Sequence, residues 1–170
     1  MTTLTFKPNA VTKNLLSGLK NRTRDIIIQR YGLGDMPKRK TLEAIGQQYG
    51  ITRERIRQIE NFALNSIKQS QVFKSSNEAF LELKDIIGNK GRVITEKEIL
   101  DHLTSDLGLK NHIFFLLVLG DNFIKLKEDD EFHHRWTIDK ETAEKVQEAL
   151  RRLHKEISEE DLVPEKEIIS

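Results

Sequence analysis

Cysteine is absent from this chain of 170 residues, so neither disulfide bonds nor thiolate metal sites can form. The sequence has no run of 18 apolar residues, which excludes an ordinary membrane-spanning helix. Its first residues lack the long apolar core of a signal peptide. We therefore expect a cytoplasmic protein. Only three prolines and nine glycines occur, which favours a folded chain of one medium or two small domains.

The net charge of +1 conceals a strong polarity along the sequence. Residues 1–76 hold 14 Lys and Arg against 5 Asp and Glu, a net charge of +9. Residues 77–170 hold 14 Lys and Arg against 22 Asp and Glu, a net charge of −8. So unequal a division predicts two modules with different partners. The basic half suits a polyanion such as nucleic acid, and the acidic half does not.

Apolar residues at helical spacing predict two helices before residue 32. Residues 1–12 have no clear period and are expected to be irregular. The isoleucines of residues 26–28 could also form a strand, but their charged flanks and the following Gly32 favour a helix that ends there. Residues 32–40 hold two glycines, a proline and three consecutive basic residues, and we assign them to a loop. The first helix is indicated by the spacing of Val11, Leu15, Leu16 and Leu19.

The segment 41–68 predicts a helix-turn-helix, the DNA-reading motif. Thr41 and Thr52 can cap its two helices. The small Gly46 lets the helices cross closely, and Gly50 supplies the positive φ that the turn needs. An apolar stripe that buries the contact between the helices consists of Ile45, Ile51, Ile56 and Ile59.

The opposite face of the second helix carries polar side chains suited to base edges. Arginine can donate two hydrogen bonds to guanine, glutamine can pair with adenine, and glutamate can accept from cytosine. The first turn of a recognition helix is the part that enters the major groove. An alternative is a solvated face with helix salt bridges, which the agreement of apolar spacing, turn glycine and polar stripe disfavours. The predicted base-reading residues are Arg53, Glu54, Arg57 and Gln58.

Basic residues around this helix are candidates for contacts to phosphates, which position a protein on DNA without reading sequence. From chemistry alone these are Arg55 and the cluster Lys38, Arg39 and Lys40.

The acidic half follows the element order of a winged helix over residues 77–138, after a polar joint at residues 70–76. The order is a helix, a short strand at residues 92–94, a helix capped by Thr95, a helix at residues 110–119 and a hairpin. We therefore expect a mainly α fold, in which a helical helix-turn-helix domain is joined to a winged-helix domain with a small β-hairpin.

A long amphipathic helix is expected over residues 140–157, and it opens an internal repeat. VITEKEIL at residues 93–100 is echoed by LVPEKEII at residues 162–169. The repeat suggests that residues 140–170 begin a second, truncated winged helix, in which case the chain is a fragment of a longer protein. The alternative is chance similarity between helices rich in Glu and Lys.

Residues 11–69 resemble the C-terminal, region 4 module of sigma-70 initiation factors, through LLSGLKNRTRDIIIQRYGL and TLEAIGQQYGITRERIRQIENFALNSIK, in which TRERIRQIE is the most specific part. This resemblance implies binding to the −35 promoter element and to the flap of RNA polymerase. The loop 32–40 departs from the family, being more basic and about one residue longer. The resemblance places Arg53, Glu54, Arg57 and Gln58 at base-facing positions, and Arg22, Arg30, Thr41 and Arg55 at or near the DNA backbone.

The residues upstream of position 11 are too few to form the sigma modules that open the −10 element and bind the polymerase clamp. We therefore do not expect the chain to initiate transcription alone.

Residues 77–138 resemble the HARE-type winged helix of the RNA polymerase delta subunit, through TEKEIL, FFLLVLGDNFIKLKED and RWTI. This implies a role in regulating transcription but transfers no site residues. Trp136 is expected to pack under the wing. An acidic winged helix is poorly matched to DNA, so contact with protein is favoured, with a purely stabilising domain as the alternative.

Sites for catalysis, cofactors or metals are not predicted. His133 and His134 are adjacent and would point to opposite faces of a strand, and His102 and His112 share no ligand spacing with them. No phosphate loop or nucleophile elbow occurs. The run from Asp129 to Glu131 is expected to be a solvated turn.

The leading hypothesis is a DNA-binding regulator that works with RNA polymerase at a −35-like element, in the cytoplasm at the nucleoid. The alternative is an interaction protein, such as a decoy on the polymerase flap, whose DNA binding is incidental. An enzymatic role would need a domain beyond Ser170. The oligomeric state is left open.

Overall fold

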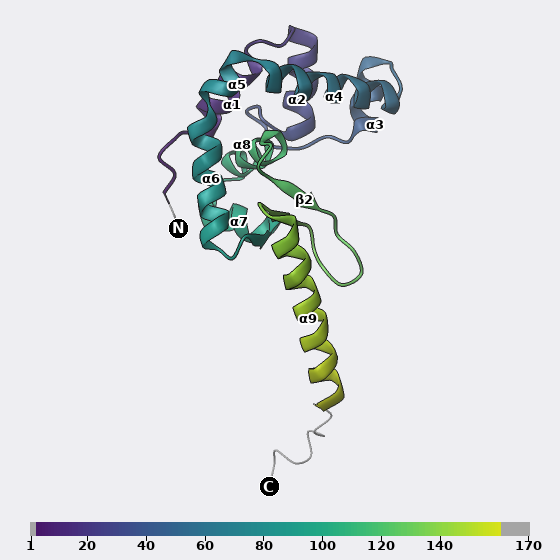
Figure 1. Cartoon of the computed structure of the whole chain (residues 1–170). Coiled ribbons are helices and arrows are strands. Elements are labelled where there is room, and N and C mark those ends of the chain that lie inside the picture. Colours follow the sequence, from purple (N-terminus) through teal and green to yellow (C-terminus); the bar gives the residue numbers. More distant parts are fainter. Residues whose placement is uncertain (1–2, 161–170) are drawn as a thin grey trace.

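The structure is a computed structural model that describes residues 3–160, with side chains described as far as residue 157. As the sequence predicted, it is mainly α-helical with one small antiparallel sheet (Figure 1). The first five helices are α1 (Pro8–Leu16), α2 (Asn21–Tyr31), α3 (Leu42–Tyr49), α4 (Arg53–Gln69) and α5 (Gln71–Ser75). The remaining elements are α6 (Asn77–Asn89), β1 (Val93–Thr95), α7 (Glu96–Leu103), α8 (Leu107–Leu119), β2 (Ile124–Leu126), β3 (Arg135–Thr137) and α9 (Lys140–Glu160).

The order from α6 to β3 is that of a winged helix, as expected. The strands lie in the order β1-β3-β2, and both pairings are antiparallel. Trp136 is in the central strand, opposite Ile94 on one side and Lys125 on the other. Its side chain is only 2% exposed and meets the ring of Phe114 edge-on, with the centroids 6.2 Å apart. The expectation that Trp136 packs under the wing therefore agrees with the structure.

Three local expectations were wrong, and each error has a physical reason. Residues 1–12 were expected to be irregular, yet α1 begins at Pro8, whose fixed φ suits the first helical position. The polar joint 70–76 contains α5, because the Ser70 hydroxyl accepts from the Phe73 amide and caps it. Helix α8 begins three residues earlier than predicted, because the carboxylate of Asp106 accepts from the Leu109 amide.

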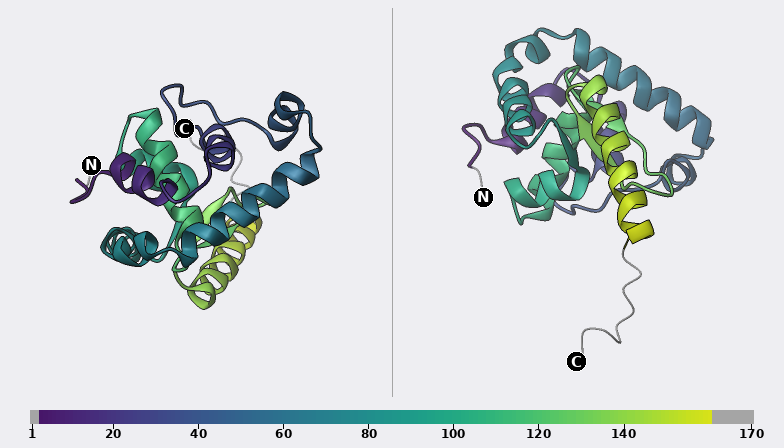
Figure 2. Two further views of the ribbon diagram at one scale, coloured as in Figure 1. Left: turned by 90° about the horizontal axis from the view of Figure 1, so that it is seen from above. Right: turned by 60° about the horizontal axis from the view of Figure 1, so that its bottom comes forward.

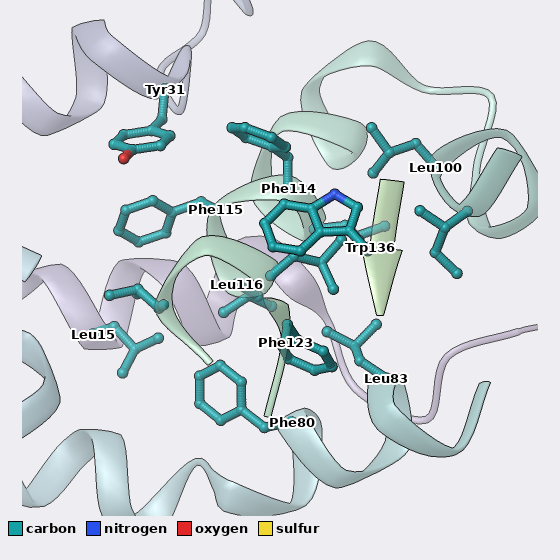
Figure 3. Close-up of a cluster of buried hydrophobic side chains, with 14 of the residues drawn as sticks. Leu15, Tyr31, Phe80, Leu83, Leu100, Phe114, Phe115, Leu116, Phe123 and Trp136 are labelled. Carbon is teal, nitrogen blue, oxygen red and sulfur yellow. The ribbon is translucent and has the colours of Figure 1, made fainter. Parts of the chain in front are cut away.

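The main hydrophobic core is shared by the basic and the acidic halves. Leu15 of α1 and Tyr31 of α2 belong to the same buried cluster as Phe114 and Phe115 of α8 (Figure 3). The rings of Tyr31 and Phe115 are 4.9 Å apart at their centroids. The division of charge between the two halves is thus a property of the surface, and no gap in the core separates the proposed modules 11–69 and 77–138.

A second, smaller core lies inside the helix-turn-helix. It consists of Ile26, Ile45 and Ile56, each fully buried, with Leu42 and Tyr49 packed against it. This cluster fixes α4 against α2 and α3.

Helix α9 starts against the winged helix and then leaves it. Ala143 is buried near β1, whereas the later part of the helix extends beyond the rest of the fold (Figure 1). Both long helices, α4 and α9, lie on the outside of the molecule (Figure 2). The helix predicted from residue 140 is present, while residues 161–170, on which the proposed second winged helix depends, lie outside the described residues. Across residues 3–160, no helix has the length and apolar character needed to cross a membrane.

Candidate nucleic-acid interface

Two glycines and two threonine caps fix the helix ends and the turn of the helix-turn-helix. The hydroxyls of Thr41 and Thr52 accept from the backbone amides of Ala44 and Arg55. Gly50 ends α3 with φ of 66°. A Cβ at Gly46 would lie 2.6 Å from the carbonyl oxygen of Ile51, so only glycine allows α3 to approach the turn this closely.

The four predicted base-reading residues lie together on the first two turns of α4. Arg53, Glu54, Arg57 and Gln58 are all exposed, while Ile56 between them is fully buried. The structure thus separates a polar face from an apolar face on one helix, as the spacing predicted. No core contact depends on the four polar side chains.

Within this face, Glu54 and Arg57 form a two-pronged ion pair. Nε of Arg57 donates to Oε2 of Glu54 at 2.8 Å, and a terminal guanidinium nitrogen donates to Oε1 at 2.7 Å. The amide of Gln58 approaches the same Oε1 at 3.4 Å. The hydrogen bond from Arg57 holds the pKa of the Glu54 carboxyl below its ordinary value, so Glu54 is an anion at neutral pH. An ionised Glu54 can only accept hydrogen bonds, which suits a cytosine amino group.

Two of the predicted backbone-contacting residues flank this face. Arg55 donates to Oε1 of Gln58 at 3.1 Å, and the guanidinium of Arg22 lies 5.3 Å from the centre of the Tyr49 ring. Both residues line a hollow of about 750 Å³ between α2 and α4, together with Lys20. Three cations therefore lie together beside the polar face of α4.

The other predicted phosphate contacts are mostly engaged within the protein. Arg30 forms a 3.3 Å ion pair with Glu60 and donates to the carbonyl of Lys40. The ammonium of Lys40 donates to Gln29 at 2.7 Å and to Gln48 at 2.9 Å. In the loop 32–40, Lys38 is left as an exposed cation without a contact of this kind among the described residues.

Arg39 turns away from the helix-turn-helix and onto the winged helix. Its Nε donates to Oδ1 of Asn111 at 2.7 Å, and its guanidinium lies 3.8 Å from the centre of the Phe114 ring. Burial in this contact lowers the pKa of Arg39 from its ordinary value. The role predicted for Arg39, a phosphate contact, therefore competes with a role in joining the two halves.

Asn111 is the residue that the sequence analysis missed. It is 2% exposed, and its amide also donates to the carbonyls of Gly32 and Pro37, at 3.0 and 2.9 Å. Asn111 thus holds both ends of the basic loop against α8. Asn111 lies two residues before the apolar run IFFLLVL, and a polar amide so close to a buried run was the signal that could have found it, because a buried amide must have partners.

The two adjacent histidines lie before β3 and not on a strand, so the expectation that they point to opposite faces of a strand was wrong. His133 and His134 both approach the carboxylate of Glu128, at 3.0 and 3.6 Å. Over the part of the chain that the structure describes, no group of three or more His, Asp or Glu side chains could hold a metal ion.

Comparison with known proteins supports the assignment of the first half. Residues 15–69 match the family "Sigma-70, region 4", a DNA-binding module that is not an enzyme. The RNA polymerase sigma factor SigA of Microcystis aeruginosa is 52% identical over 56 residues, which is 33% of this chain and 13% of the relative. The principal sigma factor HrdD of Streptomyces griseus is 44% identical over 66 residues, 39% of this chain and 20% of the relative.

The chain thus spans a fifth or less of the length of these relatives. The matched segment contains all of α2, α3 and α4, including the exposed polar face of α4. The N-terminal third of this chain is therefore similar to the region 4 module of sigma-70 factors.

Proposed function

We propose that this chain binds double-stranded DNA at a −35-like promoter element and acts as a transcription regulator, or sigma-like accessory factor, together with RNA polymerase. The proposal rests chiefly on one observation. Arg53, Glu54, Arg57 and Gln58 are exposed together on the capped, first two turns of α4, within the segment that matches sigma-70 region 4.

The four side chains have complementary parts in this proposal. Arg57 and Arg53 donate to guanine, Gln58 pairs with adenine, and Glu54 accepts from cytosine. Glu54 and Arg57 bond to each other in the free protein, so base contacts by these two side chains exchange this exposed ion pair for hydrogen bonds to DNA. Arg22, Lys38 and Arg55 contact phosphates and set the register of α4 in the major groove.

The winged-helix half has a different proposed role. Its sequence is acidic, so it is repelled by DNA and is better suited to contact another protein. We propose that this half takes part in the regulation of transcription, as its resemblance to the HARE-type winged helix of the polymerase delta subunit implies. A cytoplasmic, nucleoid-associated location follows from both roles.

A second candidate is an interaction protein that binds RNA polymerase, with DNA binding incidental. The observation in its favour is that Arg30, Arg39 and Lys40 are committed to contacts inside the protein, which leaves fewer cations for phosphates. The same resemblance to sigma-70 region 4 supports contact with polymerase in both candidates.

Fluorescence anisotropy with the whole chain separates the two candidates. A labelled duplex carrying a −35 element and a scrambled duplex of the same composition are titrated at about 100 mM salt, where non-specific binding is weakened. Preference for the −35 duplex by about 10-fold or more, the effect of one or two good base contacts, supports the first candidate. Equal and weak binding to both duplexes, with capture of RNA polymerase in a pull-down, supports the second.

A further inference from the structure

Helix α9 carries an apolar repeat with coiled-coil spacing, and the described chain leaves the later part of this repeat about half exposed. Its apolar residues are spaced by three, four, three and four positions, which is a period of 3.5. This period keeps a seam on one side of a helix when two helices supercoil around each other. The seam consists of Ala143, Val146, Leu150, Leu153 and Ile157.

The exposure of this seam rises along the helix. Ala143 is 1% exposed because it packs on the winged helix, whereas Leu150, Leu153 and Ile157 are 47%, 51% and 49% exposed. Three large aliphatic side chains in a row, each about half exposed, form a contiguous apolar strip of the kind that marks an interaction surface.

The strip is one wall of a groove whose other wall is the wing. Leu150, Leu153 and Ile157 line a hollow of about 570 Å³ together with Phe132. The wing side of this hollow is acidic, with Asp130 and Glu131, and the helix side carries basic groups, with Arg151 and His154. Arg151 donates to Glu131 across this hollow, so these two charges are already paired within the chain, and the apolar strip between them is suited to an uncharged surface.

The charges of α9 favour a second copy of this chain over an acidic or a basic partner. Most lie away from the seam, and three pairs are closed within the helix: Lys140 with Glu144, Lys145 with Glu141, and Arg152 with Glu148. The positions beside the seam are the uncharged Thr142, Gln147 and Ala149 and, near its end, His154 and Glu156. Along most of the seam, two identical helices can therefore approach without repulsion between like charges.

We propose that α9 and the adjoining wing form a docking surface for a second copy of this chain. The pair is isologous, so the apolar strip of one copy packs against the same strip of the other. The exposed seam from Leu150 to Ile157 is about one heptad long and buries less than the lower limit of standard interfaces, about 1,200 Å², so we expect a weak dimer that dissociates in the micromolar range. If the proposed DNA binding holds, the dimer carries two recognition helices.

Sedimentation equilibrium of the 170-residue chain tests the proposal without reference to DNA. The average mass should rise from 19.8 kDa towards twice that value as the concentration increases to about 200 µM, well above a micromolar dissociation constant. The double variant Leu150→Glu, Leu153→Glu should stay monomeric with an unchanged circular dichroism spectrum. Leu107→Glu, at another exposed leucine, should dimerise as the parent does.

Engineered cysteines give a second, positive readout, because the chain has none of its own. Single variants Leu150→Cys, Leu153→Cys and Ile157→Cys are oxidised, with Lys145→Cys on the outer side of α9 as the control. Disulfide-linked dimers from the seam positions and not from Lys145→Cys support the proposal. Cross-linking at all three seam positions indicates parallel helices, and at one alone antiparallel helices. A chain that is monomeric at about 200 µM, with no excess of cross-linking at the seam, overturns it.

Discussion

The side-chain amide of Asn111 donates a 3.0 Å hydrogen bond to the main-chain carbonyl of Gly32, which joins residues 79 positions apart in the sequence. The same amide group also donates to the carbonyl of Pro37 and accepts a hydrogen bond from Arg39. One buried side chain of the winged helix therefore holds the loop that leads into the helix-turn-helix, and it fixes the two halves relative to each other at this point.

Replacing Asn111 should weaken the whole fold. In Asn111→Ala the carbonyls of Gly32 and Pro37 lose their donor and Arg39 loses its acceptor. Buried groups left without partners cost about 1–3 kcal/mol of unfolding free energy, measurable by urea denaturation. Asn65→Ala, on the exposed side of α4, is the matched control and should be close to neutral. An Asn111→Ala protein as stable as the parent would show that the clamp contributes nothing.

Two glycines with nearly equal φ should respond differently to alanine. Gly32 has φ of 64° and Gly50 has φ of 66°, so either substitution strains the backbone by about 1 kcal/mol. At Gly50 the added Cβ meets open space, whereas at Gly32 it would lie 2.7 Å from Nδ2 of Asn111. We expect Gly32→Ala to lower the urea midpoint clearly more than Gly50→Ala. Equal shifts of the urea midpoint would mean that Asn111 and α8 move away from the added Cβ without loss of stability.

The helix-turn-helix was predictable because its signals are local. Thr52, Gly50 and the 3.6-residue spacing around Ile56 act within a few positions of one another, and the structure places them as expected. The contact between Arg39 and Asn111 spans 72 residues, and no periodicity reports such a pairing. The early start of α8 was, in contrast, signalled locally by Asp106 and was missed because the apolar run begins later.

The shared core could not be foreseen for a related reason. The amphipathic pattern of α1 indicates that Leu15 and Leu16 are buried, but it does not indicate which residues pack against them. The division of charge near residue 76 suggested separate domains, but charge describes surfaces. The packing of Tyr31 on Phe115 depends on tertiary structure alone.

Lys38 and Arg39 are adjacent in sequence but should differ in function. Lys38→Ala should weaken binding to any duplex and reduce the slope of log affinity against log salt by about 0.9, the contribution of one phosphate contact. Its thermal stability should be unchanged, because Lys38 is exposed. Arg39→Ala should mainly lower stability, since it uncovers Phe114 and leaves Asn111 without a donor. The opposite pattern would place the phosphate contact at Arg39.

Stability should fall in mild acid because of His112. This side chain is half-buried, and among the described residues its Nδ1 is buried without a hydrogen-bond partner. Burial lowers the pKa of His112 from its ordinary value of 6.5, so the fold favours the neutral ring. The contribution of His112 to the free energy of unfolding is fully present above pH 6.5, and it declines as the pH falls through the lower pKa of the folded state.

Urea denaturation at pH 7.5 and at a pH of about 5.5, below the unfolded pKa of histidine, measures this effect. His112→Gln should lose less stability between the two values than the parent protein does. His133→Gln, at an exposed histidine of the wing, should behave as the parent. If His112→Gln loses as much as the parent, other groups cause the acid sensitivity.

The most direct test of the account is the binding of Arg57→Ala to a −35 duplex and to its scrambled counterpart. Arg57 is exposed, and its ion pair with Glu54 contributes little to stability, so the variant should fold normally. One lost bidentate base contact should reduce affinity for the −35 duplex by about 5- to 150-fold. The scrambled duplex should be affected far less, and Arg55→Ala should weaken both equally. An equal loss on both duplexes for Arg57→Ala would contradict direct readout by α4.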